Sequence, residues 1–532
     1  MAQKKELTGK VVDESNGQPL EGVNVIIDKS KTGTSTKKDG TFTISVKSAK
    51  TTLVVSSVGY ATQIIKTDKL TDTLRIMMKQ SFSDNTEVVV IGYGTQRRSD
   101  VTGAISKYKN DKLDESPVSR LDQALQGKIA GLQVQNVTSE AGADPKINIR
   151  GVSSIYAGAE PLVVVDGQPM PDGLSFVNMA DVESVEILKD AASAAIYGSR
   201  GASGVILITT KTGKADKVKY SFKYSMGIKN PYKLYDVMTT TEYVNRLYYE
   251  YQLKMDDPLE TITPPYSATD NERAGYVIEN RLLNGKGVDW QAQGLRTGLF
   301  RNIQLSATGG KSDFKYYLSG GYQKEQGVMK NSSFEKMNFM SKLDFNLSKK
   351  VKAVVSIAPS YAYRESPAVN YTTFMRYPSF MPVYHSDSTI HLIVDNPYVP
   401  HNPQWDNLQV GDFAQPRHFN NLYYYGYMPD GSFWDNSGAD PFSSSTNSPT
   451  SILNNTEIFT KDYRLQSSID LTYKIRKGLD FKSQLSGYFN YTYGLNWANK
   501  NAEQDGTVSK GVFTNNTARN IFCLLYTSDA AD

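Results

Sequence analysis

From residue 217 onward, apolar and polar side chains alternate along the chain with a period of two. In the first such stretch, Val218, Tyr220 and Phe222 share one face, whereas lysines and serines occupy the positions between them. Alternation of this kind predicts β-strands with one apolar and one polar face. We identify seven strands on this basis, at about 217–228, 303–307, 314–322, 339–347, 351–363, 469–475 and 479–493.

Two classes of protein share this alternation. Strands of a transmembrane β-barrel turn apolar side chains to the lipid and carry aromatic girdles near both membrane interfaces. A large soluble β-sandwich alternates in the same way. Of the 34 tyrosines, only five precede residue 213, and several predicted strands end in aromatic residues. This enrichment favours a barrel for residues 214–522.

One long segment, residues 364–450, interrupts the alternation. It contains 10 of the 21 prolines and all four histidines. A Pro-rich, aromatic excursion between barrel strands predicts extracellular loops. Five aromatic residues in it are candidates for contact with a substrate or with a lid partner, and packing within the loops is the alternative for each of them. These candidates are Trp405, Tyr423, Tyr424, Tyr425 and Trp434.

The histidines and the glycine-rich stretches do not form recognisable sites for a metal or a nucleotide. The histidines are separated by 6, 10 and 17 residues, which does not match a helical or hairpin metal site. They are His385, His391, His401 and His418. Residues 198–204 and 310–312 are rich in glycine, but neither stretch has the spacing and context of a nucleotide-binding loop. We therefore predict no metal site and no cofactor.

The first 80 residues predict a small β-sandwich. Short apolar runs are separated by turn signals such as Asn16-Gly17 and Asp39-Gly40, and Phe42, Ile44 and Val46 share one face after the second turn. Many short strands with regular turns are typical of a sandwich. The segment has no histidine, no Ser/His/Asp set and no evident carboxylate pair. A binding or spacer module is therefore favoured over an enzyme.

Residues 96–213 predict a compact mixed α+β domain of roughly 120 residues. A helical turn or two is expected at 121–128, since the stretch ends in glycine and lysine. Strands are expected at 131–134, 146–151, 161–167, 181–190 and 201–211. The strand at 161–167 is apolar throughout and enters an Asp-Gly turn, which predicts a buried position.

A short apolar peptide precedes this domain. It reads Glu87, Val88, Val89, Val90, Ile91, Gly92 and Tyr93, and its β-branched residues favour an extended strand. The peptide is either a core strand of the following domain or an exposed strand that adds to the sheet edge of a partner. Pairing of the second kind depends mainly on main-chain hydrogen bonds.

Composition excludes three classes of protein. The 532 residues include one cysteine, so no disulfide framework can form within the chain. A formal net charge of +4 over this length does not predict a nucleic-acid-binding surface. No stretch approaches the roughly 18 consecutive apolar residues of a membrane-spanning helix.

Particular motifs resemble known families. Residues 9–13, 19–23, 39–42 and 58–60 resemble the carboxypeptidase-regulatory-like domain. Segments 87–103, 121–136, 147–154, 162–169 and 181–213 look like the plug domain of SusC/RagA-type TonB-dependent outer-membrane transporters of Bacteroidetes. The combination of Val-Glu-Ile-Leu-Lys-Asp, Tyr-Gly-Ser-Arg-Gly and Gly-Val-Ile-Leu-Ile-Thr-Thr-Lys carries this likeness.

The resemblance implies a transporter without covalent chemistry. TonB would engage the peptide from Glu87 to Tyr93, rearrange the plug and open a path for an oligosaccharide or peptide captured with a SusD-like surface lipoprotein. The protein would lie in the outer-membrane lipid. The fold class is then mainly β, with an N-terminal β-sandwich, an α+β plug domain and an incomplete antiparallel transmembrane β-barrel.

The expected domain limits follow. Residues 1–80 form the sandwich, 81–95 a linker with the TonB box, 96–213 the plug, and 214–522 the first part of the barrel. Plugged barrels have about 22 strands, so seven represent about a third of one. Residues 523–532, which include the single cysteine, show no alternation into a closing strand and are expected to be a non-native tail. Residues 1–5 contain no apolar signal-peptide core.

Two other functions use the same strands. One is a secreted, soluble glycan-binding protein or adhesin built from sandwiches. The other is a surface glycan hydrolase, which needs two carboxylates at a set separation around the scissile bond. Sequence spacing cannot establish such a pair, and we predict no catalytic residues.

Overall fold

A computed structural model of the chain divides into two compact units, Met1–Thr102 and Gly103–Asp532. The structure describes residues 5–14, 17–28, 32–46, 48, 51–57, 60, 62–67, 74–79, 88–91, 94–97, 105–109, 120–136, 140–149, 160–171, 173–246, 249, 287–394, 405–419, 425–427, 433–435, 447–476, 479–499, 502 and 512–531.

The first unit contains a β-sandwich, as predicted. One sheet has the order β4-β1-β7 and the other the order β3-β2-β5-β6. Phe42, Ile44 and Val46 of β4 lie in the core between the sheets, which confirms the shared face read from the sequence. The strands are β1 (Lys5–Asp13), β2 (Asn24–Ile27), β3 (Gly33–Ser35), β4 (Thr41–Val46), β5 (Thr51–Ser56), β6 (Gln63–Thr67) and β7 (Leu74–Met78).

The second unit begins with a mixed α+β domain. Its five-stranded sheet has the order β10-β15-β16-β13-β14, and β11 pairs with β12 beside it. The fully buried strand β13 lies between β16, to which it is parallel, and β14. The elements are β10 (Ile105–Lys109), α1 (Leu121–Leu125), β11 (Leu132–Gln135), β12 (Lys146–Ile149), β13 (Leu162–Val165), β14 (Gln168–Met170), η3 (Met179–Asp181), β15 (Val182–Leu188), α2 (Ala191–Ala194), η4 (Ala195–Gly201) and β16 (Val205–Thr210).

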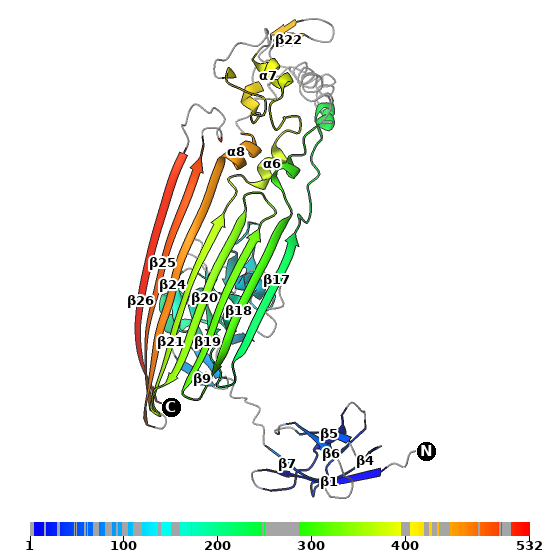
Figure 1. Cartoon of the computed structure of the whole chain (residues 1–532), viewed down its shortest axis with the longest axis vertical. Coiled ribbons are helices and arrows are strands. Elements are labelled where there is room, and N and C mark those ends of the chain that lie inside the picture. The colour runs from blue at the N-terminus through cyan, green and yellow to red at the C-terminus, as the bar shows by residue number, and fades with distance from the viewer. Residues whose placement is uncertain are drawn as a thin grey trace. The chain divides into compact units, whose positions relative to one another are not determined.

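A large antiparallel sheet follows, and the mixed domain lies against one of its faces (Figure 1). The seven strands predicted from alternation all lie within it, and β26 adds an eighth. Its strands, in order, are β17 (Lys219–Lys229), β18 (Gly298–Gly310), β19 (Phe314–Gln326), β20 (Ser333–Asn346), β21 (Val351–Glu365), β24 (Thr456–Arg476), β25 (Leu479–Ala498) and β26 (Val512–Ala531).

The last strand includes most of the expected tail. β26 runs to Ala531 and pairs residue by residue with β25, although residues 523–532 show no alternation into a closing strand. An edge strand is held by main-chain hydrogen bonds, which form whether or not the side chains alternate. The absence of alternation therefore did not predict the absence of a strand.

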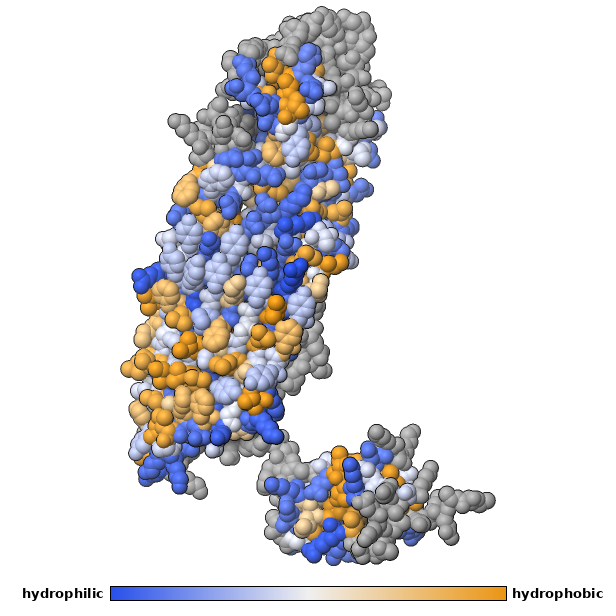
Figure 2. Space-filling model, in the orientation of Figure 1, coloured by the Kyte–Doolittle hydropathy of each residue, from blue (hydrophilic) through white to orange (hydrophobic). Residues whose placement is uncertain are grey.

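The outer face of the large sheet is apolar. Figure 2 shows apolar side chains gathered over these strands, most densely in the lower half of the sheet in this view. One cross-strand row consists of Leu343, Val355, Ile469, Leu485 and Leu525. A second row is aromatic, with ring centroids 5.1 Å apart for Tyr361 and Tyr463 and 6.2 Å apart for Tyr463 and Tyr491. Apolar and aromatic rows of this kind are typical of a barrel wall.

The excursion between β21 and β24 shares a hydrophobic core with the connection between β17 and β18. Phe374, Phe380 and Phe419 of the excursion and Trp290 of that connection are all nearly inaccessible to solvent within it. None of the helices in the described part of the chain has the length and apolar run that a membrane span requires. The elements that enclose the core are α5 (Trp290–Gly294), α6 (Tyr371–Arg376), α7 (Asp387–Ile393), η7 (Pro416–Phe419) and α8 (Pro449–Asn455), and the short strands β22 (Tyr425–Tyr427) and β23 (Phe433–Asp435) lie between η7 and α8 in the chain.

Candidate functional site

The predicted docking peptide lies in a two-stranded hairpin. Its residues Val88–Ile91 form β8, which pairs antiparallel with β9 (Gly94–Arg97). Glu87, Gly92 and Tyr93 lie outside the described residues. Within the described residues this sheet has only these two strands, so one edge of β8 carries main-chain groups that no neighbouring strand pairs with.

The turn between β13 and β14 contacts the wall formed by the large sheet. Asp166 and Gly167 both have positive φ, of 47° and 85°, as a tight Asp-Gly turn requires. The Nζ of Lys342 on β20 lies 2.9 Å from Asp166 Oδ2 and donates to Thr210 Oγ1 at 2.9 Å. Thr210 in turn donates to Asp166 from its main-chain N–H and its hydroxyl. We call Asp166, Thr210 and Lys342 the latch.

The latch is a nearly buried ion pair. The side chains of Lys342 and Asp166 are 9% and 17% exposed. Burial alone would raise the pKa of Asp166, but the charge of Lys342 and the hydrogen bonds from Thr210 outweigh burial and hold that pKa below its usual range. Asp166 is therefore ionised at neutral pH. Gln484 of β25 also donates to the main-chain oxygen of Asp166 at 3.0 Å, so two wall strands, β20 and β25, contact the same turn.

Asp181 forms a second contact between the mixed domain and the wall. Its carboxylate accepts hydrogen bonds from Tyr317 of β19 at 3.0 Å and from Asn178 at 2.9 Å. Burial raises the pKa of Asp181, and the hydrogen bonds offset this only in part. Asn178 and Gln304 of β18 also bond to each other through their side-chain amides.

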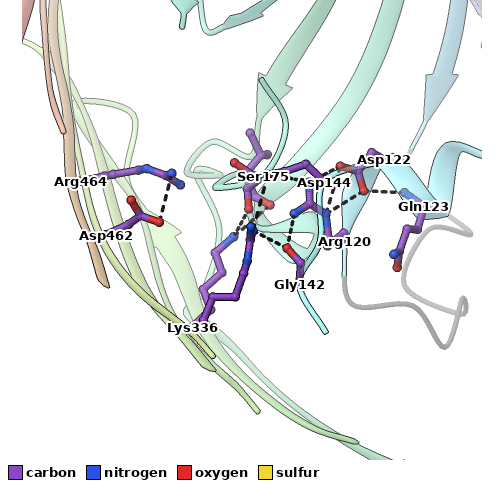
Figure 3. A network of polar contacts seen from close by, with 11 residues as sticks. Arg120, Asp122, Gln123, Gly142, Asp144, Ser175, Lys336, Asp462 and Arg464 are labelled. Atoms are coloured by element: carbon purple, nitrogen blue, oxygen red, sulfur yellow. Dashed lines mark hydrogen bonds and ion pairs between the residues drawn. The ribbon is translucent and has the colours of Figure 1, made fainter. Parts of the chain in front are cut away.

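A third contact is a cluster of charged side chains, drawn in Figure 3. Arg120, just before α1, is buried and lies 2.5 Å from Asp122 and 2.7 Å from Asp144. From the wall, Lys336 donates to the main-chain oxygen of Ser175 at 3.2 Å. The further members are Arg364, which donates to the oxygen of Gly142, and the pair Asp462 and Arg464 at 3.7 Å. We call these seven side chains, Arg120, Asp122, Asp144, Lys336, Arg364, Asp462 and Arg464, the wall cluster.

Sequence reasoning did not identify the wall residues of these contacts. Lys342 is a buried lysine on the polar face of the strand predicted at 339–347, where an alternating pattern allows any polar residue, and Lys336 precedes that predicted strand. The only available signal was the Asp-Gly turn after an apolar strand. The sequence did not reveal that a lysine 176 residues away would meet it.

The aromatic candidates in the excursion have different placements. Trp405 is only 9% exposed and meets the ring of His418 edge-on at 4.7 Å, so packing within the core describes its position better than substrate contact. Tyr423 and Tyr424 lie outside the described residues. Tyr425 and Trp434 belong to the paired strands β22 and β23, of which only the main chain is described.

Two histidines that are far apart in the sequence meet in this core. His385 Nε2 lies 2.8 Å from His418 Nδ1, which also accepts from the main-chain N–H of Gln415. His385 Nε2 is therefore the donor in this contact. Within the described ranges, no three histidine, cysteine, aspartate or glutamate side chains come together as metal ligands.

Acidification should loosen this part of the excursion. Burial lowers the pKa of His385 to about 4, against the charge of Asp412, and lowers the pKa of His418 to about 3, with a further contribution from His385. The unfolded chain binds protons near pH 6.5, whereas the folded core does not bind them until about pH 4. Stability should therefore fall as the pH drops from 7.5 to 5.

Hydrogen exchange, corrected for the intrinsic pH effect, measures this loosening. Residues 383–394 and 412–419 should exchange faster at pH 5 than at pH 7.5. His418→Gln should weaken the pH response, whereas substitution of the exposed His391 by Gln should leave it intact. Equal protection at both pH values in the unsubstituted protein would contradict the assignment.

Two domain models match the chain. Residues 7–90 match the CarboxypepD_reg-like domain, and residues 97–205 match the TonB-dependent Receptor Plug Domain. The first match covers the sandwich and extends to β8. The second covers most of the mixed domain, including Asp166 and Asp181, and we use the name plug for the mixed domain from here on.

Curated relatives are receptors of one type. The chain is 32% identical over 414 residues to TonB-dependent receptor P3 of Formosa agariphila, a match that covers 75% of this chain and 38% of that protein. It is 34% identical over 360 residues to TonB-dependent receptor SusC of Bacteroides thetaiotaomicron, with 66% and 32% covered. The chain therefore spans less than half the length of these relatives.

Solved structures share the architecture. The RagAB peptide transporter superposes with a TM-score of 0.58 at 20% identity, over 81% of this chain and 45% of that chain. The RagAB peptide importer in its open-open state gives 0.58 at 23% identity, over 83% and 46%. At these identities the likeness concerns the fold, which is a plug beside a large antiparallel sheet. The two domain models and the sequence relatives show that the chain belongs to the SusC/RagA family of TonB-dependent receptors, and the fold agrees with this assignment.

Proposed function

We propose that the receptor containing this chain actively imports a nutrient, an oligosaccharide or a peptide, across the outer membrane. The observation that carries the proposal is the plug, which is fixed to the polar face of a sheet whose other face is apolar. A sheet with an apolar outer face and a polar inner face suits a lipid-facing wall around a polar lumen. A plug held by a nearly buried ion pair and by hydrogen bonds moves at a cost in free energy, which an energy source would supply.

The energy source proposed here is TonB, which would bind the strand from Glu87 to Tyr93. Support comes from β8, which is extended and has one edge unpaired within the described residues. A partner strand can add to such an edge through main-chain hydrogen bonds. The chain's similarity to receptors named for TonB dependence points to the same partner.

A SusD-like lipoprotein is the proposed partner at the cell surface. The excursion between β21 and β24 would form part of the surface that meets it, with Tyr423, Tyr424, Tyr425 and Trp434 as candidate contacts for this partner or for the cargo. The family assignment supports this choice, since the solved RagAB assembly is a peptide transporter with the same fold. We propose no covalent chemistry for the chain.

Cell fractionation separates this proposal from a secreted soluble binding protein. The complete gene product should sediment with the outer membrane and resist extraction by alkaline carbonate, because its apolar outer face needs lipid. A product recovered in the soluble fraction is incompatible with the transporter.

Uptake then tests import itself. Disruption of the gene should remove growth on either a set of oligosaccharides or a set of peptides as sole carbon source. In the intact strain, an uncoupler of the proton gradient should stop uptake of the labelled compound but leave its binding at the cell surface. Uptake that continues without the gradient would contradict an energised transporter.

A further inference from the structure

The wall cluster surrounds a cavity between the plug and the wall. The cavity has a volume of about 80 Å³, and its lining includes Arg120, Asp144, Lys336, Arg364, Asp462 and Arg464. Arg120 and Asp144 come from the plug, and the other four side chains come from β20, β21 and β24 of the wall (Figure 3). A polar cavity of this size can hold more than one water molecule or a small ion.

The charges of the wall cluster do not balance. Four cationic side chains face three carboxylates. Arg120 pairs with Asp122 and Asp144, Arg364 reaches Asp144 at 3.5 Å, and Arg464 lies 3.7 Å from Asp462. One positive charge is left without a carboxylate of its own.

The surplus charge resides on Lys336. This side chain is 7% exposed, and no carboxylate lies within ion-pair distance of its Nζ among the described residues. Its acceptors are the main-chain oxygens of Ser175 at 3.2 Å and Val177 at 3.5 Å. The guanidinium groups of Arg120 and Arg464 add unfavourable positive potential at Lys336, and the more distant carboxylates of Asp122 and Asp181 offset it only in part. Carbonyl dipoles alone compensate a buried ammonium poorly.

A second group also lacks a partner at this cavity. The Nε–H of Arg364 is buried and has no hydrogen-bond acceptor among the described residues. Two unrelated donors, an ammonium and a guanidinium N–H, thus face one small cavity that has excess positive potential.

We propose that this cavity binds a small inorganic oxyanion of the size of phosphate. A water molecule could accept hydrogen bonds there but would leave the charge of Lys336 uncompensated. Ammonium and guanidinium groups prefer oxyanions because each oxygen accepts a charge-assisted hydrogen bond. The anion would contact Lys336 and Arg364 from the wall and Arg120 from the plug, and it would fasten the plug to the wall. The proposal does not depend on which nutrient the receptor carries.

Thermal unfolding of the receptor in detergent tests the site. The protein is titrated with inorganic phosphate at pH 7.5 and constant ionic strength, with gluconate, which is too large for the cavity, as the balancing anion. We expect the unfolding midpoint to rise saturably, by about 1 °C at tenfold the dissociation constant and about 3 °C at 1,000-fold. Lys336→Met should abolish this rise. In phosphate-free buffer this variant should be at least as stable as the unsubstituted receptor, since it removes an uncompensated buried charge.

Lys342→Met is the matched control. Lys342 lies on the same strand, is buried to the same degree and faces the plug, but it has Asp166 as its carboxylate partner. This variant should lower the midpoint in every buffer and keep the phosphate-dependent rise. Arg364→Lys, which keeps the charge but removes the Nε–H, should weaken the rise.

Three results would overturn the proposal. The first is an unsubstituted receptor whose midpoint does not respond to phosphate. The second is an equal response in Lys336→Met. The third is a response lost equally in Lys342→Met, which would attribute it to general loosening of the plug.

Discussion

Substitution of Val90 by proline should reduce energised uptake about 100-fold and leave surface binding of the cargo unchanged. Ile91 and Gly94 flank a two-residue connection, and in such hairpins the flanking pair exchanges main-chain hydrogen bonds. Pairs then alternate, so the N–H groups of Val88 and Val90 point to the open edge of β8. Proline at position 90 removes an outward donor that a partner strand would use and leaves the partner's acceptor unpaired, at a cost of about 1–3 kcal/mol.

Two controls separate docking from hairpin folding. Val90→Thr keeps a β-branched side chain and every main-chain donor, so uptake should stay near the unsubstituted level. Val89→Pro removes a donor that points to β9, and it should disrupt the hairpin itself. Two measurements apply to each variant: the uptake of labelled cargo, and pull-down of the receptor with the soluble domain of TonB. Unchanged uptake by Val90→Pro would exclude the strand as the docking site.

The strands of the wall could be predicted because their signal is local. Side chains such as Val218, Tyr220 and Phe222 alternate within one short window, and the physics of a two-faced sheet imposes that period wherever the strand pairs. The core of the sandwich was predictable for the same reason, as Phe42 and Ile44 show.

The contacts between plug and wall have no local signal. Lys342 is one of several lysines on the polar faces of strands, and its partner Asp166 lies 176 residues away. The histidine spacing likewise gave no reason to place His385 against His418, because α7 and η7 must first pack around a shared core. Such pairs depend on tertiary packing, which a single sequence does not display.

The last strand of the sheet, β26, pairs without an alternating pattern at its end. The sequence after Cys523 loses the alternating pattern, and yet the main chain continues beside β25 to Ala531. Alternation reports which faces are apolar and polar, whereas pairing requires only a free neighbouring edge. Patterns therefore predict central strands better than the last strand of a sheet.

Substitution of Lys342 by methionine should loosen the plug strongly at neutral pH. Removal of one partner from a buried ion pair costs about 3–5 kcal/mol, because the remaining charge stays desolvated. Here the remaining charge is Asp166, and Asp470 of β24 lies close enough to repel it. Amide hydrogens of β13 and β14 should exchange about 10²–10³-fold faster than in the unsubstituted receptor, if they exchange through release of the plug.

The pH dependence identifies the cause of this loosening. Lys342 is the main influence that keeps the pKa of Asp166 low, so without it burial should raise that pKa above the unfolded value. A carboxyl group with a raised pKa destabilises the folded state at high pH. The lost stability returns as the pH falls and the group is protonated. Protection of β13 in Lys342→Met should therefore increase from pH 7.5 to pH 5, whereas the unsubstituted latch should change little.

A double variant completes the argument. Lys342→Met combined with Asp166→Asn removes both charges and keeps a polar side chain beside Thr210, so most of the lost protection should return at pH 7.5. The partly exposed pair of Lys352 and Asp344 provides a reference, since loss of Lys352 should cost no more than about 1 kcal/mol. If Lys342→Met and the double variant were equally loose at every pH, the latch would contribute packing rather than charge. The release of the plug would then not depend on breaking this ion pair.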